Sequence, residues 1–408
     1  MILPIEYKWL RGARVRLDPV LKEQGILKDV VDLPDAPSVL REAEKLGFKV
    51  QYQTFETPDD ILLPSFLLPH QQEVVRKLWH GGVLADAPRM GKTVSSIGWA
   101  EAIATCEDRH MTCMIICPAI LVGQWKRHVE RFGTDIVTYQ VVSKDAKEYP
   151  DRTDLLIVDE ARHFKHATIS RYGKLEKIQR ERTLCLEATP FPDYVDDIYG
   201  LLHLVRPSWF PSKKQFDDVY VWKSGKIVLL NEERFLEDTA DLLMWRRKDY
   251  DRNITTVHSE DREEALERLK RMPRPMVVFA DTRETAEELA KELGGKPITG
   301  DQSPKSRIKI VNDFQAGKVD VLVCTFWAAG EGLDLSRAKT CAVFGYDWTP
   351  GTITQAIART DHIDPSRPKA DVFYMLWPGV LQRKEQTTKD LKTLLLPEWA
   401  EVVTLDSY

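Results

Sequence analysis

Short runs of apolar residues recur along the chain, and each is followed by a turn and a helical stretch. Inside the runs Val, Ile and Leu follow one another without polar alternation, which is typical of strands that are buried on both faces of a parallel sheet. Strands of this kind that alternate with helices predict an α/β fold. The runs are Gly82–Asp86, Cys113–Cys117, Leu155–Asp159, Leu184–Ala188, Met276–Ala280, Val321–Thr325, Ala342–Gly345 and Val372–Leu376.

The runs fall into two groups, and this division predicts two lobes. The first group spans residues 67–205 and the second spans residues 275–378. The stretch between them is less regular and rich in charged and aromatic side chains, which is where we expect a domain junction. We therefore predict a small N-terminal accessory domain over residues 1–66, a first lobe over residues 67–254 and a second lobe over residues 255–408.

The segment GVLADAPRMGKT, which starts at Gly82, predicts a phosphate-binding loop. A strand and a loop precede Gly-Lys-Thr at the start of a helix, and this is the context that such a loop requires. Backbone N–H groups are expected to face the phosphates, with Lys92 at the β- and γ-phosphates as the first catalytic candidate and the Thr93 hydroxyl on Mg²⁺. The alternative is a chance Gly-Lys-Thr, which the strand–loop–helix context disfavours. The predicted ATP contacts of this segment are Arg89, Met90, Gly91, Lys92 and Thr93.

Two carboxylates, Asp159 and Glu160, lie at the end of the apolar run LLIVD. In a site that hydrolyses nucleotides, one such carboxylate orders Mg²⁺ and the other polarises the attacking water. The pair therefore supplies two candidate catalytic residues. An acidic loop after a strand is the alternative reading, and the position of the pair 67 residues after the loop lysine favours the catalytic one.

An arginine from the second group of runs is the last catalytic candidate. Arg359 lies in the segment QAIARTDHI, residues 355–363. An arginine that is delivered across a gap between domains stabilises charge on a transferring γ-phosphoryl group and accelerates the reaction by ~10³–10⁵. A solvated helix arginine is the alternative, and the two motifs of the first lobe favour the catalytic reading.

The composition restricts the possible partners and locations of the chain. Its net charge is −5, from 58 basic and 63 acidic side chains, so a nucleic-acid partner requires a local basic groove. The six cysteines form no CxxC pair, which argues against a zinc site. No apolar run approaches the ~20 residues of a membrane span, and we find no secretion signal. These features predict a protein of a reducing compartment, the cytoplasm.

In their order and spacing, these motifs resemble a superfamily-two helicase motor, and most of all its Swi/Snf branch of DNA translocases. The resemblance runs over residues 67–376. In the first lobe it includes LLPHQ, MIICPAILVGQWKRHVERF with its Gln124-Trp125 pair, IVDEARHFKH, LEATPFPDYVDDIYGLLHLVRPSWF and LLMWRRKDY. In the second lobe it includes VVFADTRETAEELAKEL and TFWAAGEGLDLSRAKTCAVFGYDWTPGTITQAIARTDHI.

The resemblance implies two tandem RecA-like lobes, with ATP in the cleft between them and DNA across both lobes on another face. It implies that Thr93 and Asp159 hold Mg²⁺. It also adds residues to the expected site: Gln71 at the adenine base, Gly332 and Asp334 at ATP, and Thr189 and Gln355 as residues that couple hydrolysis to movement on DNA.

Four positions depart from the family pattern, and the first is Asp86, which stands where the loop pattern usually begins with glycine. Arg89 stands where related loops have glycine, Arg162 replaces the histidine of the DEAH-type box, and His362 replaces the second arginine of the last motif. The arginine-finger role therefore falls on Arg359 alone, unless another arginine such as Arg367 compensates.

Phosphate contacts dominate the affinity of proteins for DNA, so we expect basic and hydroxyl side chains along one groove. The segment VYVWKSGKIVLL, residues 219–230, predicts a β-hairpin with a basic tip. One interpretation is that this tip inserts into a duplex or a branch point. The alternative is that the hairpin only extends the lobe and does not contact DNA. Each candidate is also explained as an ordinary solvated residue. The candidate DNA contacts are Lys126, Arg127, Thr282, Arg283, Thr325, Lys223 and Lys226.

The sequence favours an ATP-dependent DNA helicase or translocase, a DNA-stimulated ATPase that acts on duplex or branched DNA in replication, recombination or repair. Residues 207–275 leave no room for the large helical insertions of chromatin remodellers, so we expect a compact motor. Such a motor would suit the cytoplasm of a bacterial cell or a phage-infected host. We expect a monomer that binds DNA and hydrolyses ATP with Mg²⁺ as cofactor. We expect no association with membranes, and we expect other replication or recombination proteins as partners. Two alternatives stay open: an ATP-binding nucleic-acid clamp or switch without robust hydrolysis, and an RNA-directed helicase.

Overall fold

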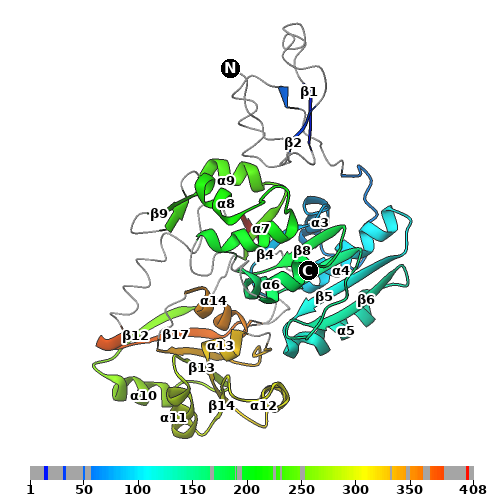
Figure 1. Ribbon diagram of the computed structural model, residues 1–408. Helices are drawn as coiled ribbons and strands as arrows, with labels where there is room; N and C mark the ends of the chain where they lie inside the picture. The colour runs from blue at the N-terminus through cyan, green and yellow to red at the C-terminus, as the bar shows by residue number, and fades with distance from the viewer. Residues whose placement is uncertain are drawn as a thin grey trace.

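Figure 1 shows the computed structural model of the chain. The structure describes residues 57–380, apart from gaps at 166–169, 189, 191–194, 224–226, 230–231, 249–252, 331–332, 346–349 and 362–367. It also describes four short strands outside this range: β1 (Ala13–Arg16), β2 (Val31–Leu33), β3 (Lys49–Val50) and β18 (Glu401–Val403). In the part of the chain described in this way, the helices are too short or too polar to cross a membrane.

The first lobe is built on a sheet of seven strands that pair in parallel throughout. In spatial order the strands are β18, β11 (Leu243–Lys248), β4 (Gly82–Asp86), β8 (Arg182–Leu186), β7 (Leu155–Asp159), β5 (Met111–Cys117) and β6 (Val137–Ser143). The helices of this lobe are α3 (Pro69–Lys77), α4 (Lys92–Cys106), α5 (Val122–Phe132), α6 (Ser170–Glu176), α7 (Tyr199–Val205), α8 (Lys213–Tyr220) and α9 (Glu232–Thr239).

Both faces of the first sheet are covered. In β4, Val83 packs in a core with Phe216 of α8 and Phe235 of α9, whereas its neighbour Leu84 packs in a second core with Ile97 of α4. Consecutive residues of a central strand therefore face two different cores. This arrangement explains why the apolar runs lack polar alternation, as the sequence predicts.

The second lobe repeats this plan with six parallel strands, and Figure 1 shows it below the first. In spatial order the strands are β12 (Ile254–His258), β17 (Asp371–Leu376), β16 (Thr340–Phe344), β13 (Met276–Ala280), β15 (Val321–Thr325) and β14 (Lys296–Ile298). The helices are α10 (Arg262–Lys270), α11 (Arg283–Leu293), α12 (Pro304–Gln315), α13 (Phe326–Gly330) and α14 (Pro350–Ala358). The predicted fold class, two α/β lobes with parallel sheets, is confirmed.

Side-chain caps define where three helices of the second lobe begin. Asp261, Thr282 and Ser303 precede α10, α11 and α12, and each side chain accepts a hydrogen bond from the backbone N–H three residues later. Such a cap satisfies one of the N–H groups that the first helical turn leaves without a partner. The caps hold the loops at the amino ends of these helices in a defined conformation.

Two small antiparallel sheets lie outside the two main parallel sheets. Strands β1, β2 and β3 form an antiparallel sheet in the order β2-β1-β3. Strands β9 (Val221–Lys223) and β10 (Ile227–Leu229) pair antiparallel, as predicted for the hairpin, and the tip at residues 224–226 lies outside the described residues. Strand β18 belongs to the predicted range of the second lobe, yet it pairs with β11 at the edge of the first sheet.

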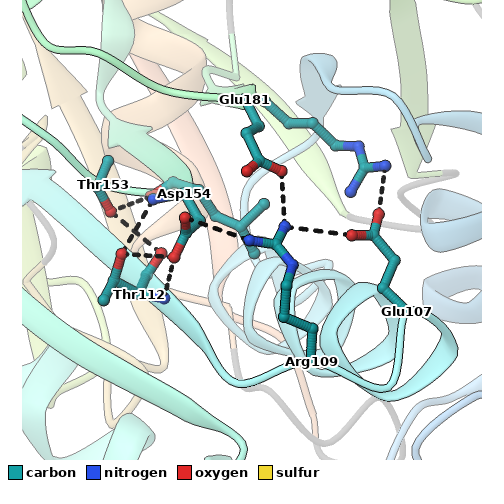
Figure 2. Close-up of polar contacts among 8 residues, drawn as sticks. Glu107, Arg109, Thr112, Thr153, Asp154 and Glu181 are labelled. Atoms are coloured by element: carbon teal, nitrogen blue, oxygen red, sulfur yellow. Dashed lines mark hydrogen bonds and ion pairs between the residues drawn. The ribbon is translucent and has the colours of Figure 1, made fainter.

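An ion-pair network ties the amino ends of the strands of the first sheet together (Figure 2). Arg109 donates hydrogen bonds to Glu181 (2.7 Å), Glu107 (3.2 Å) and Asp154 (3.5 Å), and Asp154 accepts the backbone N–H of Thr112 at 2.7 Å. The hydrogen bond to Glu181 is the main cause of the raised pKa of Arg109. This network joins the ends of α4, β5, β7 and β8, and it lies at the edge of the sheet opposite to the loops described next.

Candidate active site

The predicted catalytic residues of the first lobe lie at the carboxyl edge of its sheet. The phosphate-binding loop follows β4, and the acidic pair Asp159 and Glu160 follows or ends β7. Because both strands run parallel in one sheet, their carboxyl ends face the same side. In open α/β sheets this edge is where ligands bind.

The phosphate-binding loop is formed by close backbone packing. Gly91 has φ 83° and is the N-cap of α4, and a Cβ at this position would overlap the side-chain nitrogen of Gln71. Gln71 is buried in α3, and its Oε1 accepts the backbone N–H of Leu68 at 3.1 Å. Lys92 Nζ donates to the carbonyl oxygen of Asp86 at 2.7 Å. Glycine at 91 therefore lets Gln71 and the loop lie in direct contact, next to the free N–H groups at the start of α4.

A buried ion pair stabilises the strand end from which the phosphate-binding loop starts. Arg246 of β11 donates two hydrogen bonds of 2.7 Å to the carboxylate of Asp86, the last residue of β4, and both side chains are 0% exposed. Arg246 also donates to the carbonyl oxygen of His70 at 2.9 Å and to Glu73 at 3.0 Å. The sequence does not predict this contact, because two consecutive arginines are unusual in a buried strand.

Asp159 and Glu160 have different surroundings and therefore different protonation behaviour. Asp159 accepts hydrogen bonds from the backbone N–H of Glu160 at 2.9 Å and from the Trp125 indole at 2.8 Å. Burial, and then the charge of Glu160, raises the pKa of Asp159 to about 6. Burial alone would also raise the pKa of Glu160, but the charges of Arg162, Arg359, Lys92 and His163 together outweigh burial and lower that pKa. Glu160 is thus the carboxylate that stays ionised.

Arginines from both lobes surround Glu160. Arg162 lies 3.3 Å from one carboxylate oxygen, and Arg359, which follows α14 of the second lobe, lies 3.6 Å from the other. Arg162 also donates to Oε1 of Gln355 in α14 at 2.6 Å, and its backbone N–H donates to Glu187 at 2.8 Å. Residues that are nearly 200 positions apart therefore meet in the gap between the lobes.

Lys92 belongs to the same electrostatic group. Burial lowers the pKa of its ammonium, and the charges of Asp86, Glu160, Glu187 and Asp159 oppose this effect in that order. The structure therefore brings the four predicted catalytic residues Lys92, Asp159, Glu160 and Arg359 into one charged cluster. Glu187 is a member of the cluster that the sequence analysis did not identify.

Arg89 and Asp334, two more of the predicted ATP contacts, pair with each other across the same gap. Arg89 of the phosphate-binding loop donates to Oδ1 of Asp334 at 3.0 Å and to the carbonyl oxygen of Arg359 at 3.2 Å. The carbonyl oxygen of Met90, the next loop residue, lies 3.0 Å from Nε2 of the buried His70. Gly332 and Thr189, together with His362 and Arg367, lie outside the described residues.

Oxygen ligands for a divalent cation are present at the site. Among the described residues, His, Cys, Asp and Glu do not gather in groups of three or more that would form a metal cage. Mg²⁺ is commonly held by one or two carboxylates together with substrate phosphates and water, so such a cage is not required. The carboxylate of Asp159 and the hydroxyl of Thr93 fit this hard-oxygen donor set.

The predicted DNA contacts have different local surroundings. Lys126 and Arg127 are exposed on α5, directly after the buried Trp125. Thr282 is the cap of α11, and the neighbouring Arg283 is paired with Asp301. Thr325 ends β15 and is half-buried, and the side chains of Lys223 and Lys226 lie outside the described residues.

Comparisons with known proteins identify the relatives of this chain. The model of the SNF2-related domain matches residues 65–135 and 129–294, and that of the helicase conserved C-terminal domain matches residues 261–364. An uncharacterized ATP-dependent helicase, YqhH of Bacillus subtilis, is 28% identical over 251 residues, which are 54% of this chain and 44% of the relative. An uncharacterized ATP-dependent helicase of Mycoplasma pneumoniae is 22% identical over 388 residues, with 69% of this chain and 37% of the relative covered.

The matches also include chromatin-remodeling ATPases and solved structures. The chromatin-remodeling ATPase INO80 of Pyricularia oryzae is 23% identical over 252 residues, which cover 53% of this chain and 11% of that protein. The solved structure of the Sulfolobus solfataricus SWI2/SNF2 ATPase core in complex with dsDNA matches with a TM-score of 0.44 and 16% identity, over 84% of this chain and 99% of that chain. This chain spans less than half the length of these curated relatives.

Proposed function

Because this chain belongs to the SNF2-related family, whose model matches more than half of it, we propose that it is an ATP-dependent DNA motor of the helicase type. The motor hydrolyses ATP between its two lobes and uses the resulting opening and closing to move along DNA. The observation that carries this proposal is the meeting of Lys92 and Glu160 of the first lobe with Arg359 of the second, 3.6 Å from Glu160.

The residues of the cluster suit the steps of phosphoryl transfer. Lys92 and the N–H groups at the start of α4 bind the β- and γ-phosphates. Glu160, ionised because Arg162 and Arg359 lower its pKa, accepts a hydrogen bond from the attacking water and orients it. A γ-phosphate that enters beside Arg359 competes with Glu160 for this guanidinium, so substrate binding both recruits the arginine and releases the base.

We propose Mg²⁺ as the cofactor of this reaction. Asp159 and Thr93 would hold it. Gln71, which packs against the phosphate-binding loop, would lie at the adenine base, as the family resemblance implies. When bound, the ion neutralises charge on the phosphate oxygens. Asp159 must be ionised to serve as a ligand, and its contact with Trp125 keeps one of its oxygens oriented.

The proposed nucleic-acid partner is DNA, in duplex, forked or branched form, during replication, recombination or repair. The exposed Lys126 and Arg127 on α5 supply positive charge near the site, and Thr325 lies at the carboxyl edge of the second sheet. Between residues 207 and 275 the described elements are α8, the β9–β10 hairpin, α9, β11, β12 and α10, without a large helical insertion. This supports a compact motor rather than a nucleosome remodeller.

We further propose that the protein acts as a monomer in the cytoplasm, where it meets other replication or recombination proteins. The six cysteines are all free, which is usual in a reducing compartment. The domain division at residues 66 and 254, and the coupling roles of Thr189 and Gln355, are part of the same proposal. The contact between Gln355 and Arg162 supports the coupling role, because it joins α14 to the acidic motif.

An ATPase panel tests the proposal. Purified protein is assayed with single-stranded, duplex, forked and four-way DNA and with RNA, together with strand-separation assays on the same substrates. We expect DNA-stimulated hydrolysis that is lost in Lys92→Ala and Glu160→Gln. Binding of ATP and DNA without hydrolysis on any polynucleotide would support the clamp or switch instead, and stronger stimulation by RNA would support an RNA-directed helicase.

The basic hairpin is tested in the same assay. Lys223→Ala combined with Lys226→Ala is expected to reduce binding or unwinding of forked and four-way DNA. Unchanged binding and unwinding would show that the β9–β10 hairpin has no role in binding DNA.

A further inference from the structure

Arg89 has a backbone conformation that side chains rarely adopt. Its φ is 68°, and in the described residues only Asp108 and Glu160 also combine a side chain other than glycine's with a positive φ. Glycine adopts this conformation without a steric cost, whereas a residue with a Cβ is strained. A long cationic side chain at this place in the phosphate-binding loop therefore calls for an interaction that compensates for the strain.

The side chain of Arg89 crosses from the first lobe to the second. Its Nη2 donates to Oδ1 of Asp334 at 3.0 Å and to the carbonyl oxygen of Arg359 at 3.2 Å, and the side chain is only 13% exposed. The two acceptors lie 245 and 270 residues away along the chain. Arg89 is thus bonded to the backbone of the residue whose guanidinium faces Glu160.

The carbonyl oxygen that Arg89 contacts lies just past the end of α14. Carbonyl groups in this position have no partner inside the helix, and a guanidinium is favoured there by the helix dipole. The same oxygen accepts the backbone N–H of Leu335 at 3.0 Å. Arg89, which is also paired with Asp334, and the N–H of Leu335 therefore hold the backbone of residue 359 in one place. A guanidinium nitrogen of Arg359 lies 3.6 Å from Glu160.

We propose that Arg89 is a positioning residue that fixes Arg359 over the phosphate-binding loop, instead of contacting ATP itself. The inference rests on the proposed function and adds a residue that acts through another. A phosphate must meet Arg359 in a narrow range of geometry, and Arg89 limits the movement of its backbone relative to the loop. Loss of Arg89 therefore slows the chemical step and leaves the binding of ATP unchanged.

Glycine and lysine substitutions test the role of Arg89 without adding backbone strain. Arg89→Gly suits the positive φ, so we expect a melting temperature that is not lowered. Because misplacement of a catalytic group costs up to about a hundredfold, we expect kcat to fall at least about tenfold with KM for ATP nearly unchanged. Arg89→Lys retains one donor and charge and should recover part of kcat.

Substitution of Asp334 tests whether Arg89 and Asp334 act through the same interaction. Asp334→Asn weakens the same inter-lobe contact and should lower kcat by less than Arg89→Gly does. The double variant should be no slower than Arg89→Gly alone, since both changes remove one interaction. Asp108→Gly is the matched control: it places glycine at another positive φ (46°), on an exposed turn after α4, and should leave kcat and KM unchanged.

Amide hydrogen exchange of residues 350–361 separates this inference from the proposed function. We expect faster exchange there in Arg89→Gly than in the wild type, whether or not the protein hydrolyses ATP. Unchanged exchange, an unchanged kcat, or a raised KM with an unchanged kcat would each overturn the positioning role. A wild-type protein that hydrolyses no ATP would overturn the proposed function, and the exchange result would still decide the role of Arg89.

Discussion

The indole nitrogen of Trp125 donates a hydrogen bond of 2.8 Å to Oδ2 of Asp159. Trp125 is buried on α5, and the next two residues along this helix are the exposed Lys126 and Arg127. One helix therefore connects a candidate DNA surface to a carboxylate of the candidate active site. This contact offers a physical route by which DNA binding changes the site for hydrolysis.

Trp125→Phe is expected to reduce the stimulation of ATP hydrolysis by DNA and to destabilise the fold. The substitution keeps an aromatic ring but leaves a buried carboxylate oxygen without its donor, which costs about 1–3 kcal/mol. The measurements are the ratio of ATPase rates with and without DNA, and the free energy of unfolding in urea. Trp209→Phe is the control, because the buried indole nitrogen of Trp209 has no hydrogen-bond partner among the described residues. Equal effects of the two substitutions would contradict the proposed route.

The pH dependence of hydrolysis should follow Asp159. Its carboxyl must be ionised to bind Mg²⁺, and burial and Glu160 raise its pKa to about 6. We therefore expect kcat/KM for ATP to be constant above this pH and to fall about tenfold per unit below it. Glu160 adds no second acid limb near this pH because its pKa is lowered. Trp125→Phe removes a donor to the ionised form and should move the limb to higher pH.

The same pKa has the opposite consequence for stability. Since the pKa of Asp159 is raised from 3.8 to about 6, the folded state binds this proton more tightly than the unfolded state does. The penalty for burying the charge is therefore full above about pH 6 and is relieved as the pH falls toward 3.8. Asp159→Asn is expected to be more stable than the wild type at neutral pH and to lose this advantage in acid. A constant difference in unfolding free energy across this range would contradict the assignment.

Removal of one partner from the buried pair of Arg246 and Asp86 should cost far more than removal of an exposed pair. Both side chains are 0% exposed, so Arg246→Met leaves an uncompensated buried charge and is expected to destabilise the first lobe by about 3–5 kcal/mol. Arg109→Ala is the comparison: its network is larger, but the side chain is 40% exposed, and such pairs contribute about 0–1 kcal/mol each. Urea unfolding of the two variants, followed by tryptophan fluorescence, measures the difference.

Salt dependence distinguishes the candidate DNA contacts. Replacement of Lys126 and Arg127 by alanine should weaken duplex binding and reduce the slope of log Kd against log salt by about 1.8, if each contacts one phosphate. Arg283→Ala should change the slope little, because this guanidinium is already paired with Asp301 and lies within 3.7 Å of Glu287. Fluorescence anisotropy with a labelled duplex measures both. A larger effect of Arg283→Ala would place the DNA on the second lobe near α11 instead.

The elements that could be predicted from the sequence are those with an uninterrupted local signal. The central strands β4, β5, β7, β13 and β15 match the apolar runs because both of their faces are covered. The edge strands β6, β12 and β14 escaped prediction, since they are partly exposed and lack such runs. Strand β11 escaped for another reason: Arg246 reads as a surface residue, and only its pairing with Asp86 lets a charge lie in the core.

The sequence alone locates the predicted phosphate-binding loop between β4 and α4 and the acidic pair at the end of β7, because each depends on neighbours within about one strand, one turn and one helix. The inter-lobe contacts do not follow from the sequence in this way. The contacts of Arg89 with Asp334 and Arg359, and of Arg162 with Gln355, join positions up to 270 residues apart. Their partners are decided by how two separately folded sheets pack against each other, and no local pattern encodes that distance. The chemistry of each half of the site is local, whereas its assembly into one cluster is a property of the tertiary structure.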